Sequence, residues 1–136
     1  DRAQAWYRFG ELVGLAFQMQ DDLLDSFGSA ATGKRSGGDI LSDKQTYLMI
    51  HCRQHGSVED RAVLDRWSGQ PEAELHDDKI AAVRAVMEAT KAPESARRQM
   101  SAYVDEARLV LASLGLSALH VTNLESLALH AITRTV

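Results

Sequence analysis

The chain has 136 residues, of which 45% are hydrophobic and 25% are charged, a composition typical of a globular domain with a buried core. Its formal net charge of −4 argues against binding to a nucleic-acid backbone. The longest nearly apolar stretch, residues 109–119, is too short to cross a bilayer, and the lone cysteine, Cys52, fits a reducing cytoplasm better than a disulfide-bonded, secreted protein.

Hydrophobic residues recur at helical spacing along most of the chain, and no segment alternates convincingly as a strand does. The clearest helix is predicted over residues 2–27, and the glycine-rich segment 28–38 that follows is predicted to be the main loop. Further helices are predicted, in chain order, over residues 42–56, 57–68, 71–90 or 72–90, 93–114 and 117–133. The sequence therefore predicts a single all-α domain of about six helices joined by short loops.

Start and stop signals support these helices. Ser42 is predicted to cap the second helix, with Gln45 three residues later completing a capping box. Gly56 is predicted to end that second helix. Gly115 is predicted to end the helix over residues 93–114. Lys44 would then lie in the first turn of the second helix, where free backbone N–H groups favour anions.

Three carboxylates share one face of the first predicted helix. At about 100° per residue, Asp21, Asp22 and Asp25 lie on the same side as Gln18, opposite an apolar stripe. Like charges at this spacing repel one another, so a cation or a basic partner is needed to neutralise them. Hard oxygen ligands favour Mg²⁺, but an isolated trio of this kind is also typical of a solvated helix face.

Two lysines bracket the glycine-rich stretch that follows. Lys34 and Lys44 can reach phosphate oxygens as point charges, and the intervening glycines allow the backbone to approach a polyanion closely. An ordinary solvent-exposed turn would have a similar composition. Neither the acids nor the lysines alone identify a function.

Taken together, these residues resemble a known family. The resemblance is carried by residues 9–25, by Gly33-Lys34, by Gly38-Asp39 and by Lys44-Gln45-Thr46. This combination is similar to the second conserved region of the trans-polyprenyl diphosphate synthases, which include farnesyl and geranylgeranyl diphosphate synthases. It covers about a third of the chain, residues 7–48. It implies that residues 1–136 are the C-terminal part of a single polyprenyl synthase domain, the C-terminal half of an isoprenoid-synthase-type helical bundle.

The resemblance assigns a metal site to the acids. It implies that Asp21, Asp22 and Asp25 are the second aspartate-rich motif and bind Mg²⁺. Asp21 and Asp22 would be direct ligands, and Asp25 would act more through bonds to the ligands and their waters.

The resemblance also implies residues that bind the substrate. Lys34 and Lys44 match lysines around the diphosphate, and Asp39 matches an acid that braces the loop. Phe17 and Gln18 match a pair that lines the pocket near the allylic diphosphate.

The family chemistry implied is head-to-tail condensation in isoprenoid biosynthesis. An allylic diphosphate ionises, the double bond of isopentenyl diphosphate attacks the carbocation, and a proton is lost. Asp21, Asp22, Lys34 and Lys44 would stabilise the departing pyrophosphate. The pyrophosphate is the implied base, so no catalytic histidine is required. The resemblance further implies that the full-length protein is a homodimer.

Two other classes of function are compatible with parts of the sequence. Squalene and phytoene synthases carry acids at the spacing of Asp21 and Asp25, but they lack the glycine- and lysine-containing segment that follows these acids here. A non-catalytic helical subunit of a heteromeric prenyl synthase is the second alternative. Its weakness is that an inactive subunit has no need to keep a costly cluster of charges.

The chain is expected to be inactive alone, because the family's first aspartate-rich motif and the basic residues that bind isopentenyl diphosphate have no counterpart in it. Incubation of the 136-residue chain with Mg²⁺, an allylic diphosphate and radiolabelled isopentenyl diphosphate should give no prenyl product. Adding a separately expressed N-terminal half should restore product. Robust activity of the chain alone would refute this expectation.

Overall fold

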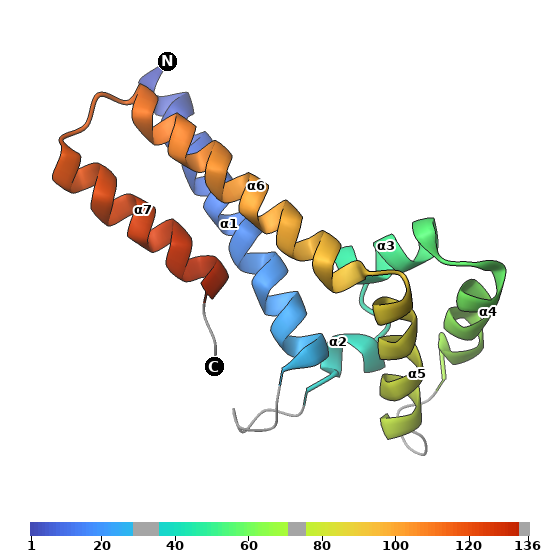
Figure 1. Ribbon diagram of the computed structural model, residues 1–136. Coiled ribbons are helices and arrows are strands. Elements are labelled where there is room, and N and C mark those ends of the chain that lie inside the picture. Colours follow the sequence, from blue (N-terminus) through green and yellow to red (C-terminus); the bar gives the residue numbers. More distant parts are fainter. Residues whose placement is uncertain (29–35, 71–75, 134–136) are drawn as a thin grey trace. The chain divides into compact units, whose positions relative to one another are not determined.

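A computed structural model describes residues 1–28, 36–70 and 76–133 of the chain. The regular elements in these ranges are all helices, which confirms the predicted all-α class. They are, in chain order, α1 (Arg2–Phe27), α2 (Gly38–Leu41), α3 (Tyr47–His55), α4 (Val58–Trp67), α5 (His76–Ala89), α6 (Ala92–Ser113) and α7 (Ala118–Thr133) (Figure 1). None of these helices combines the length and the apolar character needed to cross a membrane.

The chain divides into two compact units. The first unit contains residues Asp1–Gln20 and Arg97–Thr135, and the second contains residues 21–96. Helix α1 begins in the first unit and ends in the second, and α6 does the reverse. The assignment of the whole chain to one polyprenyl synthase domain remains a prediction.

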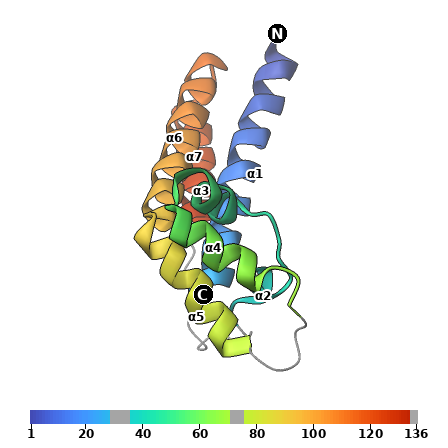
Figure 2. The same cartoon turned by 90° about the vertical axis from the view of Figure 1, so that its right-hand side faces the viewer.

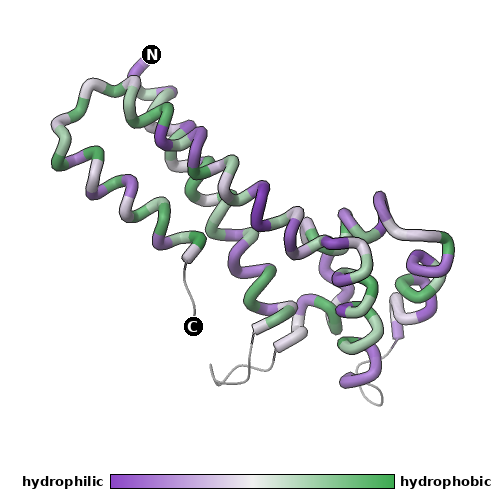
Figure 3. The backbone as a smooth tube through the Cα atoms, in the orientation of Figure 1, coloured by the Kyte–Doolittle hydropathy of each residue, from purple (hydrophilic) through white to green (hydrophobic). Residues whose placement is uncertain are grey.

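The first unit is built from α1, α6 and α7. Its core contains Phe9, Leu12 and Ala16 of α1, Val104, Ala107 and Leu111 of α6, Leu114, and Ala128 of α7. Leu12 is completely buried, a burial that typically stabilises a fold by about 1.5–3 kcal/mol. Figure 3 shows hydrophobic and hydrophilic residues alternating along α1 and α6, the pattern of helices with one buried face.

The second unit is organised around α5, which contacts α2, α3 and α4. Figure 2 shows α4 and α5 as neighbours within this unit. The buried hydrophobic residues of these four helices are Ile40, Leu48, Met49, Cys52, Leu64, Val83, Val86 and Met87. This packing fixes α2 and the connection that follows it, which carry part of the candidate site.

Several predicted helix ends are confirmed. Ser57 caps α4 and forms a capping box with Asp60, and α4 ends at Trp67 before Ser68. Gly56 follows the end of α3, and Gly115 adopts a left-handed conformation with φ 63° after α6. The predicted start of the fourth helix, at residue 71 or 72, falls within residues 71–75, which lie outside the described residues.

The predicted start of the second helix is wrong. Ser42 follows the end of the additional short helix α2, and Thr46 caps α3 by accepting a hydrogen bond from the Met49 N–H. The chain leaves helical geometry because Asp43 has a φ of 54°. Lys44 therefore lies in the connection between α2 and α3, and the described residues contain seven helices rather than about six.

Two alanine substitutions distinguish the observed cap from the predicted one. Thr46→Ala should lower the free energy of unfolding by about 1 kcal/mol, because the first turn of α3 loses a hydrogen-bond acceptor. Ser42→Ala should cost less than about 0.5 kcal/mol, because this exposed hydroxyl only donates to the Asp39 carbonyl. Urea denaturation of both variants measures the difference. A larger loss for Ser42→Ala would contradict the observed capping.

Candidate functional site

The last turns of α1 bring three aspartates into the second unit. The Asp22 side chain is buried, with 9% of its surface exposed, whereas Asp21 and Asp25 are half-buried. A buried carboxylate is costly unless a counter-charge or hydrogen-bond donors accompany it. The surroundings of Asp22 therefore need a cation.

Lys44 supplies a positive charge to this cluster. Its Nζ lies 3.2 Å from Asp22 Oδ1 and 3.6 Å from Asp39 Oδ2. The hydrogen bond to Asp22 raises the pKa of Lys44; burial opposes this rise, and the charges of Asp22 and Asp39 add to it. The lysine side chain remains 47% exposed, so its ammonium group is accessible to an anionic ligand.

The carboxylates near Lys44 also act on one another. Burial raises the pKa of Asp39, and the charges of Asp25 and Asp22 raise it further, although Lys44 acts in the opposite direction. Asp22, Asp25 and Asp39 therefore form a cluster of carboxylates in which Asp25 and Asp22 repel Asp39. A further cation among these oxygens would relieve the repulsion.

Asp25 joins the end of α1 to the start of α2. Its Oδ2 accepts a hydrogen bond of 2.7 Å from the Asp39 N–H, and its carbonyl accepts from the Gly37 N–H at 2.6 Å and from the Ser36 hydroxyl at 3.2 Å. These bonds fix residues 36–39 against α1. Asp25 thereby fixes the backbone of Asp39, from which the Asp39 side chain extends.

Gly37 occupies a position that requires glycine. Its φ is 101°, in the left-handed region, and an added Cβ would lie 2.7 Å from Ile80 Cδ1. The close contact with Ile80 therefore places the start of α2 against α5.

Arg84 of α5 is a second brace that the sequence did not reveal. Its Nε donates to the Ser26 carbonyl, and its guanidinium also donates to the Ser36 hydroxyl. Ser26 precedes the glycine-rich segment 28–38, and Ser36 lies near the end of that segment. No local pattern singles out Arg84, because its partners are 58 and 48 residues away in sequence.

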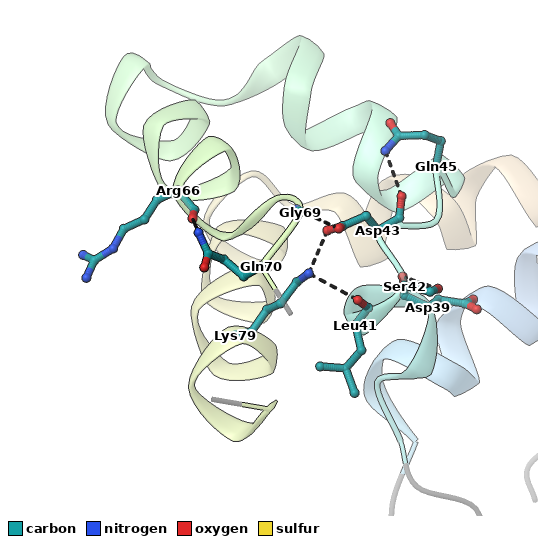
Figure 4. A network of polar contacts seen from close by, with 9 residues as sticks. All are labelled: Asp39, Leu41, Ser42, Asp43, Gln45, Arg66, Gly69, Gln70 and Lys79. Carbon is teal, nitrogen blue, oxygen red and sulfur yellow. Dashed lines mark hydrogen bonds and ion pairs between the residues drawn. The ribbon is translucent and has the colours of Figure 1, made fainter. Parts of the chain in front are cut away.

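A buried ion pair beside Lys44 was also missed. Lys79 Nζ lies 2.8 Å from Asp43 Oδ1, and the Lys79 side chain is only 5% exposed (Figure 4). Burial alone would raise the pKa of Asp43. Hydrogen bonds from Lys79 and from the Gly69 N–H, together with the charges of Lys79 and Arg53, outweigh burial, so the pKa is lowered.

One sequence signal could have revealed this pair. Lys79 lies four and seven residues before Val83 and Val86, which are buried on the same face of α5. A lysine at a buried helical position needs an acidic partner.

The structure brings some of the predicted site residues together, but not all of them. Asp22, Asp25, Asp39 and Lys44 come together in the second unit. Asp21 is half-buried in that unit. The two residues predicted to line the substrate pocket, Phe17 and Gln18, are exposed and belong to the first unit. Lys34 lies outside the described residues.

The oxygen donors of the cluster fit magnesium. Mg²⁺ uses one or two carboxylates together with phosphate oxygens and water, and the repulsion that Asp25 and Asp22 exert on Asp39 favours a cation. Over residues 1–28, 36–70 and 76–133, however, no three histidine, cysteine, aspartate or glutamate side chains form a preassembled metal site. Because a phosphate ligand supplies part of the magnesium coordination, a preassembled protein cage is not required.

Comparison with protein families gives an independent result. Residues 1–88, more than half of the chain, match the polyprenyl synthetase family. The matched range includes Asp21, Asp22, Asp25, Asp39 and Lys44, as well as the ion pair formed by Asp43 and Lys79.

Individual relatives and structures agree with this match. The chain is similar to farnesyl pyrophosphate synthase of Bos taurus, with 41% identity over 76 residues, which are 56% of this chain and 20% of that protein. Identity to farnesyl diphosphate synthase of Escherichia coli is 54% over 59 residues, 43% of this chain and 20% of that protein. The matches thus span about a fifth of the length of these relatives.

The fold is also similar to solved structures. A geranylgeranyl pyrophosphate synthase from Corynebacterium glutamicum, crystallised with isoprenyl diphosphate and magnesium, gives a TM-score of 0.84 with 27% identity. That similarity covers 96% of this chain and 37% of the other. A second geranylgeranyl pyrophosphate synthase gives a TM-score of 0.87 with 25% identity, over 99% of this chain and 42% of the other.

The contribution of the Asp43 carboxylate can be measured by substitution. Asp43→Asn should lower the free energy of unfolding at pH 7 by about 1–3 kcal/mol, because Lys79 loses its charged acceptor. The lowered pKa of Asp43 means that its stabilising effect is present above the ordinary value of 3.8 and is lost as the pH falls through the folded-state pKa.

The difference in the free energy of unfolding between the wild type and Asp43→Asn should therefore shrink as the pH falls through the folded-state pKa of Asp43. Denaturation of the wild type and the variant at a series of pH values tests this. A difference that is constant with pH would contradict the assigned role of the carboxylate.

Proposed function

The chain belongs to the polyprenyl synthetase family, and on this premise we propose that it supplies the pyrophosphate-holding part of a prenyltransferase. The full enzyme would join isopentenyl diphosphate to an allylic diphosphate, as implied by the farnesyl and geranylgeranyl diphosphate synthases that the chain resembles. The observation that carries the proposal is the contact of Lys44 with Asp22 and Asp39, within a cluster of carboxylates in which Asp25 and Asp22 repel Asp39.

Asp21, Asp22 and Asp25 would hold Mg²⁺ in this proposal. When bound, the metal would supply Lewis-acid stabilisation of the charge that develops on the leaving pyrophosphate. Asp21 and Asp22 are the proposed direct ligands. Asp25 already accepts the Asp39 N–H, so we assign it mainly to orientation of the site.

Lys44 would act on the pyrophosphate as a point charge. Its raised pKa keeps the ammonium protonated at neutral pH, and its exposed surface gives a phosphate oxygen room to approach. Lys34 is proposed to act in the same way. Preorganised positive charge of this kind stabilises negative charge that develops during the reaction.

Phe17 and Gln18 are proposed to line the substrate pocket near the allylic diphosphate. The assignment of Phe17 and Gln18 is supported by the family resemblance of residues 9–25. An apolar neighbour such as Phe17 would help to exclude water from a carbocation, which water would otherwise capture.

The reaction needs no basic side chain in this proposal. The allylic C–O bond breaks, the double bond of isopentenyl diphosphate forms the new C–C bond, and the departing pyrophosphate takes the proton that is lost. The full-length protein is proposed to be a cytoplasmic homodimer, and the 136-residue chain is proposed to be inactive without an N-terminal partner segment.

Binding of inorganic pyrophosphate to the chain tests the proposal directly. In calorimetric titrations, pyrophosphate should bind in the presence of Mg²⁺ and much more weakly in EDTA. Asp22→Asn and Lys44→Met should each weaken Mg²⁺-dependent binding roughly ten- to hundredfold, because each removes a charge from the cluster.

Asp65→Asn is the matched control. It removes one negative charge from an exposed aspartate that pairs with Arg53. Its affinity for pyrophosphate should stay within about twofold of the wild type. Binding that does not depend on Mg²⁺, or that is equally weakened by Asp65→Asn, would contradict the site. The absence of any binding would favour a non-catalytic helical subunit.

A further inference from the structure

The connection after α2 has the hydrogen bonds of a Schellman motif. The Asp43 N–H donates to the Ile40 carbonyl at 3.2 Å, and the Lys44 N–H donates to the Asp39 carbonyl at 3.0 Å. In this motif the residue after the cap adopts the left-handed conformation and is usually glycine. Here that residue is Asp43, with a φ of 54°.

The left-handed conformation is sterically unfavourable for a residue with a Cβ, so Asp43 needs other interactions to keep it. Both carboxylate oxygens provide them. Asp43 Oδ1 accepts from Lys79 Nζ at 2.8 Å, and Oδ2 accepts from the Gly69 N–H at 2.9 Å (Figure 4). The turn is therefore held from α5 and from the end of α4.

Lys79 stabilises the same turn in a second way. Its Nζ donates to the Leu41 carbonyl at 3.2 Å, and Leu41 is the last residue of α2. A cation at this end satisfies a carbonyl that has no partner within the helix. One buried ammonium group thus binds both the end of α2 and the residue that terminates it.

The turn determines the position of Lys44. The backbone of Lys44 is bonded to the Asp39 carbonyl, and its ammonium contacts the carboxylates of Asp39 and Asp22. A different conformation at Asp43 would change the direction in which the Lys44 side chain leaves the backbone.

We propose that Asp43 and Lys79 are positioning residues, whose buried ion pair holds the left-handed turn that presents Lys44 to Asp22 and Asp39. The consequence for ligand binding rests on the proposed function, because Lys44 is the residue assigned to pyrophosphate. Neither Asp43 nor Lys79 is proposed to touch the substrate.

Three variants of the full 136-residue chain separate positioning from general stabilisation. Lys79→Met removes the partner of Asp43 and keeps an apolar stem. The double variant Lys79→Met/Asp43→Gly removes both charges, but its glycine adopts the left-handed conformation without steric cost. Lys79→Met with Asp43→Ala removes the same charges and disfavours that conformation, so it is the matched control.

The first measurement is hydrogen exchange of the Lys44 amide, which requires no ligand. Lys79→Met should accelerate this exchange about tenfold or more, because the turn opens more often. The glycine double variant should return it to within about threefold of the wild type, and the alanine double variant should not. Titration with Mg²⁺ and inorganic pyrophosphate should rank the variants in the same way. The glycine double variant should bind pyrophosphate more tightly than Lys79→Met and more tightly than the alanine double variant.

Each outcome bears on the inference. Unchanged exchange in Lys79→Met, equal behaviour of the two double variants, or a glycine double variant that fails to fold would overturn it. Should Lys79→Met alone not fold, the two double variants decide. Folding of the glycine variant but not of its alanine counterpart would support the inference, since the two differ only at the left-handed residue.

The two readouts keep this inference separate from the proposed function. A wild-type chain that binds no pyrophosphate would defeat the proposed function. Exchange at Lys44 would still show whether Asp43 and Lys79 hold the turn.

Discussion

The ammonium group of Lys44 lies between carboxylates from two different helices, Asp22 of α1 and Asp39 of α2. Asp22 is buried, so its charge needs a counter-charge or hydrogen-bond donors, and Lys44 supplies a positive charge. The bonds of Asp25 to residues 36–39 and the turn at Asp43 bring Lys44 to it. The carboxylates of Asp25 and Asp22 still repel Asp39, a property expected of a site that receives a metal-bound anion.

Much of the fold follows from local sequence patterns. The long helices show one apolar face, and Ser57 and Gly115 mark helix ends through interactions within a few residues. The grouping of Asp22, Asp25, Asp39 and Lys44 was also predictable in part, because helical spacing placed Asp22 and Asp25 on one face and the family resemblance added Asp39 and Lys44.

The remaining features depend on contacts between residues distant in sequence. The short helix α2 and the cap at Thr46 follow from the conformation of Asp43, which Lys79 stabilises from 36 residues away. A propensity argument favours Ser42 as a cap equally well, since the hydroxyl and the spacing to Gln45 are both suitable. Only the tertiary partner of Asp43 decides between the two positions.

The two hydrogen bonds of Arg84 have a consequence for variation among related chains. They anchor the Ser26 carbonyl, before the glycine-rich segment 28–38, and the Ser36 hydroxyl, near the end of that segment. The entropy of closing a loop grows only slowly with its length, so insertions or deletions between such anchors are tolerated at little thermodynamic cost. Evolution can therefore alter the size of this segment while the acidic residues on both sides keep their places.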